Sequence, residues 1–242
     1  MLTVELVACL SDNYAYLLHD DVTGAVGIVD PSEPEPVRAA LAKRGLRLTH
    51  IFNTHHHFDH TGGNLDLKAE FGARVIGPKA DEERIPGIDD AIAHNGIITF
   101  GNHKAKVLDI PGHTKGHIAI WFEADKIVFT GDTLFAMGCG RMFEGTPPMM
   151  FTSLMILADL PPETKVYCGH EYTESNARFA VHIEPDNQAM AQRLADVKAI
   201  RAQGLPTIPT TIGLECLTNP FLTAKSAEEF GARRLAKDNF KG

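Results

Sequence analysis

Cysteine is scarce in this chain of 242 residues, and no two cysteines form a C-x-x-C pair. The four that occur, Cys9, Cys139, Cys168 and Cys216, are scattered along the sequence. Secreted domains that depend on disulfides concentrate their cysteines at close spacings in much shorter chains. We therefore expect no disulfide framework and predict a protein of the reducing cytoplasm.

Basic residues and long hydrophobic runs are also in short supply. The chain has 23 Lys and Arg against 31 Asp and Glu, for a formal net charge of -8. An acidic chain has no general attraction to nucleic acid or to anionic membranes. The segment from Met1 to Leu10 has no basic residue and is too short to span a bilayer, so it does not resemble a signal peptide. We expect a monomer that acts on a small molecule, with no nucleic-acid or membrane partner.

Hydrophobic periodicity and turn residues divide the chain near residue 170. Before that point short strands alternate with helices, and after it only helices are expected. The predicted strands cover residues 2–7, 14–19, 25–30, 48–53, 74–76, 97–100, 106–110, 118–122, 126–130 and 165–168. The predicted helices cover 34–44, 64–71, 149–160, 172–181, 187–203 and 227–237, with Ser32 as the cap of the first and Gly45 as its end. The pattern predicts an α/β domain over residues 1–170 and a helical domain over 171–242.

A polar, histidine-rich segment follows the predicted strand at 48–53. It covers residues 54–63, where we expect a loop, and reads Thr-His-His-His-Phe-Asp-His over residues 54–60. In an extended segment residues i and i+2 project to the same side, so His55 and His57 can share one metal while the turn at Phe58 directs Asp59 and His60 toward a second. Imidazole and carboxylate suit zinc, with iron or manganese as alternatives. A solvated polar loop is the competing interpretation, and His56 is left out because it points the other way.

Three further candidate ligands follow predicted strands elsewhere in the chain. They are His113, Asp132 and His170, and each comes directly after a glycine that permits a tight turn. Each alone is most often only a turn residue. Several strand ends at one edge of a sheet, each with a ligand, indicate a metal site more strongly than any one of them.

This set of residues resembles the metallo-β-lactamase superfamily, whose T-H-x-H-x-D-H motif matches Thr54 to His60. The resemblance covers about residues 1–170 and implies a four-layer αβ/βα sandwich with two divalent metal ions at one edge. It implies that one metal takes His55, His57 and His113, that the other takes Asp59, His60 and His170, and that Asp132 bridges them.

A narrower resemblance is to the glyoxalase II, or hydroxyacylglutathione hydrolase, family. It is carried by stretches at residues 10–14, 54–57, 138–145, 169–173, 219–222 and 234–240, the last reading Arg-Leu-Ala-Lys-Asp-Asn-Phe. The resemblance implies that Arg234 and Lys237 hold carboxylates of glutathione, with contacts from Tyr172 and from Arg141 to Phe143. On charge alone, a solvated helix end explains the two basic residues better, and it is the family resemblance that favours a binding role. Some members carry Tyr where this chain has Phe143, which has no hydroxyl to donate.

The function implied is a metal-dependent thioester hydrolase that cleaves S-D-lactoylglutathione to D-lactate and glutathione, the second step of methylglyoxal detoxification. Asp59 is the expected catalytic residue, because a ligand with a spare carboxylate oxygen can orient an attacking hydroxide. The first alternative is a glutathione persulfide dioxygenase on the same fold with a single iron, which needs only two His and one Asp. The second is a metal-binding protein without catalysis.

Overall fold

The computed structural model describes residues 2–242, which form two compact units. Unit 1 comprises the residues up to Asp109 together with Gly116–Gly131. Unit 2 comprises Ile110–Lys115 and Asp132–Gly242. The chain therefore enters unit 2 for six residues, Ile110–Lys115, returns to unit 1 for Gly116–Gly131, and belongs to unit 2 from Asp132 onward.

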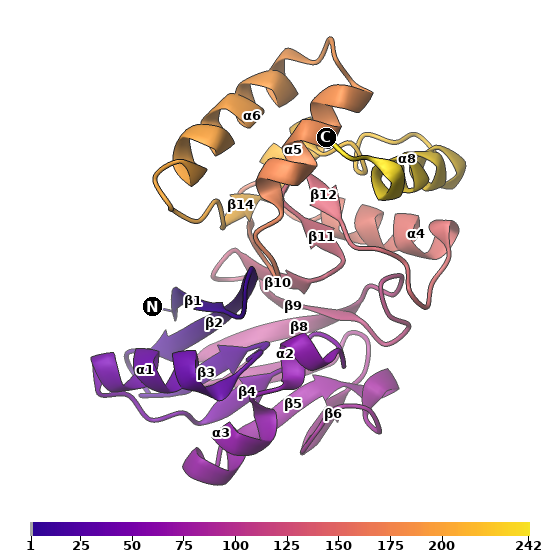
Figure 1. Cartoon of the computed structure of the whole chain (residues 1–242). Helices are drawn as coiled ribbons and strands as arrows, with labels where there is room; N and C mark the ends of the chain where they lie inside the picture. Colours follow the sequence, from indigo (N-terminus) through magenta and orange to yellow (C-terminus); the bar gives the residue numbers. More distant parts are fainter. Residues whose placement is uncertain (1) are drawn as a thin grey trace. The chain divides into compact units, whose positions relative to one another are not determined.

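The first sheet of unit 1 has six strands in chain order (Figure 1). They are β1 (Leu2–Cys9), β2 (Asn13–Asp20), β3 (Val26–Val29), β4 (His50–Phe52), β5 (Arg74–Pro78) and β6 (Asp90–Ile92). β1 to β3 pair antiparallel and β3 to β6 pair parallel. Parallel neighbours need crossover connections. These carry α1 (Pro34–Arg44), α2 (Phe58–Thr61), α3 (Asn64–Phe71) and a 3-10 turn (Lys79–Asp81).

Helices α1 and α3 lie on one face of this sheet (Figure 1). They contribute Val37, Leu41 and Leu67 to a core shared with strand residues such as Ile28 and Ile51, all at most 2% exposed. α1 ends at Gly45, whose φ of 65° is left-handed, as the sequence predicted. The predicted Ser32 cap was wrong, because Glu33 is the N-cap residue and its side chain makes no capping bond.

A second set of strands in unit 1 runs in the order β10-β9-β8-β7. They are β7 (Ile97–Phe100), β8 (His103–Asp109), β9 (Ile118–Phe122) and β10 (Ile127–Gly131), paired antiparallel. Their aromatic side chains meet those of the first sheet: Phe100 contacts Phe52 edge-on at 5.6 Å, and Phe129 lies 5.6 Å from Tyr16. Unit 1 is thus two sheets packed face to face.

Unit 2 is mainly helical. It contains α4 (Pro147–Ala158), α5 (Thr173–Ile183), α6 (Gln188–Arg201), α7 (Ile212–Thr218) and α8 (Ala227–Asn239). Two short antiparallel pairs accompany them: β11 (Leu134–Phe135) with β12 (Gly138–Cys139), and β13 (Lys165–Cys168) with β14 (Thr210–Thr211). α5 and α6 lie side by side (Figure 1), and Ala177, Ala180 and Met190 between them are fully buried. Side chains of Asn187, Thr211 and Ser226 cap α6, α7 and α8.

The sequence missed several short elements. β6, β11, β12, β14 and α7 were not predicted, and the loop expected over 54–63 contains the one-turn helix α2. These elements are two to seven residues long, too short for a hydrophobic period to be visible. The strands at 97–100, 118–122 and 165–168 and the helix at 64–71 have the predicted bounds.

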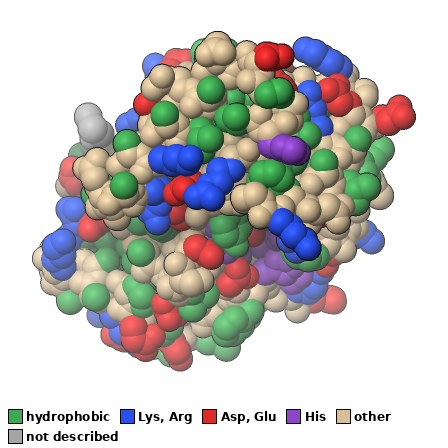
Figure 2. Space-filling view, turned by 45° about the horizontal axis from the view of Figure 1, so that its top comes forward, with side chains coloured by type: hydrophobic (Ala, Val, Ile, Leu, Met, Phe, Trp, Pro, Cys, Tyr) green, Lys and Arg blue, Asp and Glu red, His purple; other side chains and the backbone are tan. Residues whose placement is uncertain are grey.

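Among the described residues, no helix has both the length and the apolar character needed to cross a bilayer. On the face shown in Figure 2, basic and acidic side chains are interspersed. Surface pairs such as Arg38 with Glu35 and Glu70, and Arg178 with Glu174, illustrate this mixing.

Candidate metal centre and substrate contacts

The histidine-rich segment of unit 1 begins where two neighbouring parallel strands end. Asp30 directly follows β3, and Asn53 to His57 follow β4. Because β3 and β4 pair in parallel register, their carboxyl ends lie at the same edge of the sheet. Asp30, Thr54 and His55 are at most 2% exposed there. The strands therefore deliver a buried carboxylate next to the candidate ligands.

Asp30 is a site residue that the sequence did not single out, although it ends a predicted strand. Its Oδ1 accepts a hydrogen bond from the Thr54 backbone N–H at 2.8 Å, and its Oδ2 accepts one from the Thr54 hydroxyl at 2.6 Å. His60 Nδ1 lies 3.1 Å from the same Oδ2. A carboxylate can only accept here, so His60 carries its proton on Nδ1 and presents Nε2 as a lone pair.

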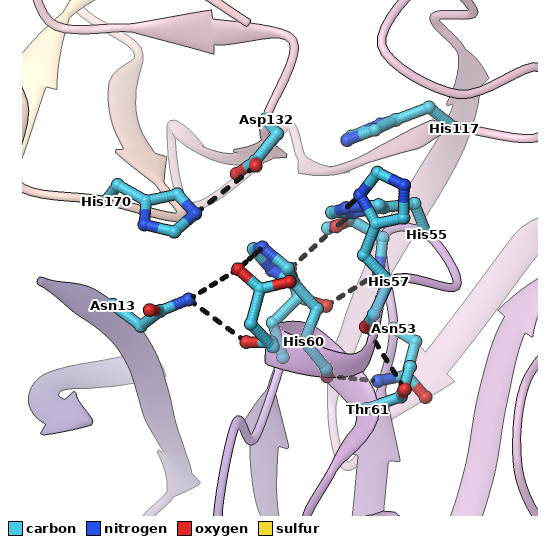
Figure 3. Close-up of polar contacts among 12 residues, drawn as sticks. Asn13, Asn53, His55, His57, His60, Thr61, His117, Asp132 and His170 are labelled. Atoms are coloured by element: carbon cyan, nitrogen blue, oxygen red, sulfur yellow. Dashed lines mark hydrogen bonds and ion pairs between the residues drawn. The ribbon is translucent and has the colours of Figure 1, made fainter. Parts of the chain in front are cut away.

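The same network orients His55 through Thr54. Since the Thr54 hydroxyl gives its proton to Asp30, its oxygen accepts from His55 Nδ1 at 3.0 Å. His55 Nε2 therefore carries a lone pair that can bind a metal ion, and it lies 3.2 Å from Nδ1 of His57 (Figure 3). Two nitrogen ligands of a tetrahedral zinc, at Zn–N of about 2.0–2.1 Å, are themselves about 3.3 Å apart. The spacing and tautomer of this pair fit a metal ion.

Asp59 and His60 project from α2, the one-turn helix that follows His57. Asn13 holds Asp59 by donating from Nδ2 to the Asp59 carboxylate and to its backbone carbonyl, both at 3.1 Å (Figure 3). His60 Nε2 lies 3.6 Å from the Asp59 carboxylate. Ligand atoms of Asp30, His55 and His60 all fall within 4.8 Å of one another. Unit 1 thus brings together all four ligands predicted from it.

Two other histidines of unit 1 flank this group. His56 points to Asp81, with Nδ1 at 2.8 Å from the carboxylate, so its exclusion as a ligand agrees with its position. His117, which the sequence analysis did not single out, is 1% exposed, and its ring stacks on His55 at 4.5 Å between centroids. Gly131 packs against both Thr54 and His117, where a Cβ atom would come within 2.8 Å of their side chains.

In unit 2, His113 is held by the chain around Arg141. His113 Nδ1 lies 2.8 Å from the Arg141 carbonyl, which only accepts, so Nε2 is again the lone-pair nitrogen. The His113 carbonyl accepts from the backbone N–H groups of Phe143 and Glu144. The preceding Gly112 has φ of 152° and no room for a side chain, because a Cβ atom would overlap Met150.

Asp132 follows β10 and meets two imidazoles. Its Oδ2 lies 3.3 Å from His170 Nε2 (Figure 3) and 3.5 Å from His113 Nε2. All three residues are at most 6% exposed. The His170 ring stacks on the Tyr172 ring at 4.7 Å with an interplanar angle of 4°. Unit 2 therefore gathers the other three predicted ligands, with one carboxylate oxygen beside both imidazoles.

Three of the predicted substrate contacts, Arg141, Arg234 and Lys237, form a cluster around Asp238 of α8. Arg234 is 5% exposed and donates to the Cys139 carbonyl at 2.8 Å and to Asp238 at 3.0 Å. Arg141 Nε lies 3.4 Å from the same Asp238 oxygen. Lys237 donates to the carbonyl and hydroxyl of Ser175, both at 3.0 Å. Three cations against one carboxylate leave this cluster with excess positive charge.

That excess shows in the electrostatics of Lys237. Burial, and after it the nearby Arg234 and Arg141 guanidiniums, lower the pKa of Lys237 to about 8. Phe143, by contrast, is 64% exposed and contacts the His113 ring edge-on at 5.2 Å. Tyr172 is 38% exposed. An anion beside the cluster would restore the charged form of Lys237.

Comparison with known proteins agrees with both resemblances. The family model of the metallo-beta-lactamase superfamily matches residues 11–170, and that of the hydroxyacylglutathione hydrolase C-terminus matches residues 171–240. A hydroxyacylglutathione hydrolase of Methylococcus capsulatus is 52% identical over 256 residues, with 100% of both chains covered. The full-length match includes the C-terminal segment with the basic cluster.

Solved structures share the fold at lower identity. ETHE1 from Myxococcus xanthus has a TM-score of 0.72 at 27% identity, covering 100% of this chain and 92% of that one. TTHA1623 in a di-iron-bound form has a TM-score of 0.63 at 29% identity, covering 91% of this chain and all of the other. The predicted metallo-β-lactamase fold with a helical C-terminal region is confirmed. From its matched family models and its full-length relatives, the chain belongs to the hydroxyacylglutathione hydrolase family of the metallo-beta-lactamase superfamily.

Proposed function

We propose that the protein hydrolyses thioesters of glutathione and 2-hydroxy acids, with S-D-lactoylglutathione as substrate and D-lactate and glutathione as products. This reaction is the second step of methylglyoxal detoxification. The observation that carries the proposal is the Asp132 carboxylate oxygen, within 3.5 Å of Nε2 of both His113 and His170. Its support from relatives is the full-length similarity to named hydroxyacylglutathione hydrolases.

Two divalent metal ions are part of this proposal. His55, His57 and His113 would hold one, Asp59, His60 and His170 the other, and Asp132 both. The donor chemistry fits, because the network assigns lone pairs to Nε2 of His55, His60 and His113. Zinc is the proposed metal, with iron or manganese as alternatives, and the relative TTHA1623 was solved with two irons. Such ions, when bound, supply water with a lowered pKa and polarise a carbonyl.

The protein's own side chains would orient the attacking water. Asn13 fixes the carboxylate of Asp59, which leaves that group positioned to orient the attacking water, the catalytic role proposed for it. Cysteine nucleophiles are not needed. Burial raises the pKa of Cys139 to about 11 and that of Cys168 to about 12, so neither is a thiolate at neutral pH.

Glutathione carries two carboxylates, and we assign them to the cationic cluster of unit 2. Arg234 and Lys237 lie one turn apart on α8, and Arg141 joins them through Asp238. Charge-assisted hydrogen bonds to carboxylates are the strong kind. Tyr172 and Phe143 are proposed as further contacts, Tyr172 through its hydroxyl and Phe143 through its ring alone.

The decisive experiment is hydrolysis of S-D-lactoylglutathione by the purified protein, with D-lactate and free thiol measured together. The same sample is then depleted of metal by a chelator and reloaded with zinc. We expect activity to disappear on depletion and to return on reloading. Turnover that survives complete removal of metal would refute the metal-dependent mechanism, and bound zinc without turnover of any glutathione thioester would refute the thioesterase.

We also propose that the protein works as a monomer in the cytoplasm. Its four cysteines are free thiols, and three of them are buried, as suits a reducing compartment. Light scattering on the eluted protein tests the monomer, and a mass near 53 kDa, about twice that of the 26.4 kDa chain, would contradict it.

A further inference from the structure

His56 stands between two proposed metal ligands, yet it faces a different group. Its Nδ1 lies 2.8 Å from the Asp81 carboxylate, and its Nε2 lies 3.2 Å from Arg84 Nη1. The second carboxylate oxygen of Asp81 accepts from Arg84 Nη2. Carboxylate, imidazole and guanidinium thus form a closed ring of hydrogen bonds, in which His56 donates from Nδ1 and accepts at Nε2.

The carboxylate at the centre of this ring is fully buried. Asp81 is 0% exposed and ends the 3-10 turn that follows β5, the parallel neighbour of β4. Gly116 packs directly on it, since a Cβ atom there would fall 2.0 Å from Asp81 Oδ1. A buried carboxylate is costly unless it is paired and hydrogen-bonded, and His56 and Arg84 meet both conditions for Asp81.

The neighbours of Asp81 connect it to the candidate metal ligands. The residue after Gly116 is His117, which stacks on His55, and the next N–H, of Ile118, donates to the Thr54 carbonyl at 2.9 Å. Asp81 therefore touches both chain segments that enclose His55. The His55 and His57 rings meet each other at 3.2 Å, while His56 between them faces Asp81, so anchoring the middle residue helps to hold its two neighbours on the other side.

We propose that Asp81, His56 and Arg84 are positioning residues that hold His55 and His57 in the metal-binding arrangement and so set the affinity for metal. The inference rests on the ligand set proposed above. Partners behind metal ligands typically change metal affinity or activity by about 10–100-fold when they are removed. Glutathione binding, assigned to unit 2, does not depend on this ring of hydrogen bonds.

The test compares His56→Leu with His56→Asn. Leu removes both ring hydrogen bonds at similar volume, whereas the Asn amide nitrogen can replace Nδ1 as the donor to Asp81. Zinc affinity of the metal-free proteins is measured by competition with a chromogenic chelator, without substrate. We expect His56→Leu to bind zinc about 10–100-fold more weakly than the parent, and His56→Asn to bind zinc within about threefold of the parent. Both variants should keep the parental KM for S-D-lactoylglutathione.

His103 provides a matched control in the same unit. Its Nδ1 also lies 2.8 Å from a carboxylate, that of Asp125, at the hairpin end of β8. His103→Leu removes the same kind of bond and should leave zinc affinity within twofold of the parent. If both His103→Leu and His56→Leu weaken zinc binding equally, the effect is general destabilisation and the proposal is wrong.

Asp81→Asn is the second variant, in case His56→Leu does not fold. It removes the charge of the ring at constant shape, and the proposal predicts a loss of zinc affinity of at least about tenfold. Zinc affinity equal to the parent in a folded His56→Leu or Asp81→Asn protein overturns the proposal. Because zinc is measured alone, that result is distinct from a failure to hydrolyse the thioester.

Discussion

At the residue scale, Asp132 is the side chain on which the proposed centre depends most. One of its carboxylate oxygens lies within 3.5 Å of imidazole nitrogens from two separate loops. We expect Asp132→Ala to lose bound metal and to lower kcat/KM by more than about a hundredfold. This loss exceeds the one expected from removing a residue that only hydrogen-bonds to a metal ligand. Steady-state kinetics and elemental analysis on one sample measure both.

The control for that prediction is Asp125→Ala, which removes a carboxylate paired to a histidine elsewhere in the chain. It should keep its metal and activity. An Asp132→Ala protein with parental metal content and turnover would show that the bridging assignment is mistaken.

Lys237 gives a prediction about pH. Burial and two neighbouring cations lower the pKa of this lysine to about 8, so above that pH the ligand-free enzyme loses one positive charge from the cluster. An anionic substrate binds the charged form better, so KM should rise as pH increases from 7 to 9 while kcat changes less. Lys237→Gln should have a raised KM that is flat over the same range. A parental KM that is constant from pH 7 to 9 contradicts this role.

Most of the candidate ligands could be predicted from the sequence because a dense motif and glycine-flanked turns mark them. Asp30 and Asn13 could not, since a single Asp or Asn near a strand end is common and its partner lies 24 or 46 residues away. His117 was missed for the same reason. Such outer residues become visible only when strand pairing places them beside a ligand.

At the scale of elements, the hairpin of β11 and β12 depends on a helix that the sequence did not predict. Asn219, at the end of α7, donates from its fully buried side chain to the carbonyls of Phe135 and Gly138 and to Glu215. We expect Asn219→Ala to reduce the free energy of unfolding by about 1–3 kcal/mol, because it leaves buried acceptors without a donor. Urea denaturation measures the change.

Asn239→Ala is the comparison, because Asn239 makes one exposed bond to the Leu235 carbonyl in α8. Its effect should stay within about 0.5 kcal/mol. Equal midpoints for the two variants would mean that Asn219 does not support the hairpin.

Helix α7 was not predicted, because Pro206, Pro209 and Pro220 on either side of it are typical of a loop. Thr211 caps its first turn, but a cap before only seven residues is a weak signal. α3, which ends at Gly72, and β9, an apolar run of five residues, had the predicted bounds. Local sequence thus predicts elements with clear end signals or unbroken apolar runs, and tertiary contacts decide many of the short ones.

At the scale of the whole molecule, metal binding should couple to stability. Ions that bind only the folded protein raise its free energy of unfolding, by about 2.7 kcal/mol at a free concentration 100 times the dissociation constant. We expect the metal-depleted protein to melt at a lower temperature than the zinc-loaded one. Scanning calorimetry in a series of zinc concentrations measures this, and a melting temperature independent of zinc contradicts the proposed centre.

The whole chain can be divided by family or by compactness, and the two divisions differ. The family models meet at residues 170 and 171, where the sequence predicted a boundary, whereas the compact units assign Asp132 onward, with Ile110–Lys115, to unit 2. The functional division into a catalytic and a substrate-binding part stays a prediction.

The passage of Ile110–Lys115 through unit 2 bears on the order in which the two units fold during synthesis. Once residue 131 has left the ribosome, every segment of unit 1 is present, including the group around His55 and His60. His113 has also emerged by then, but its unit is not complete until α8 supplies Arg234 to the Cys139 carbonyl. Since domains generally fold from the N-terminus as they emerge, we expect the proposed ligands of unit 1 to be assembled before those of unit 2. A newly made chain would then pass through a stage in which only the unit 1 part of the proposed metal centre is formed.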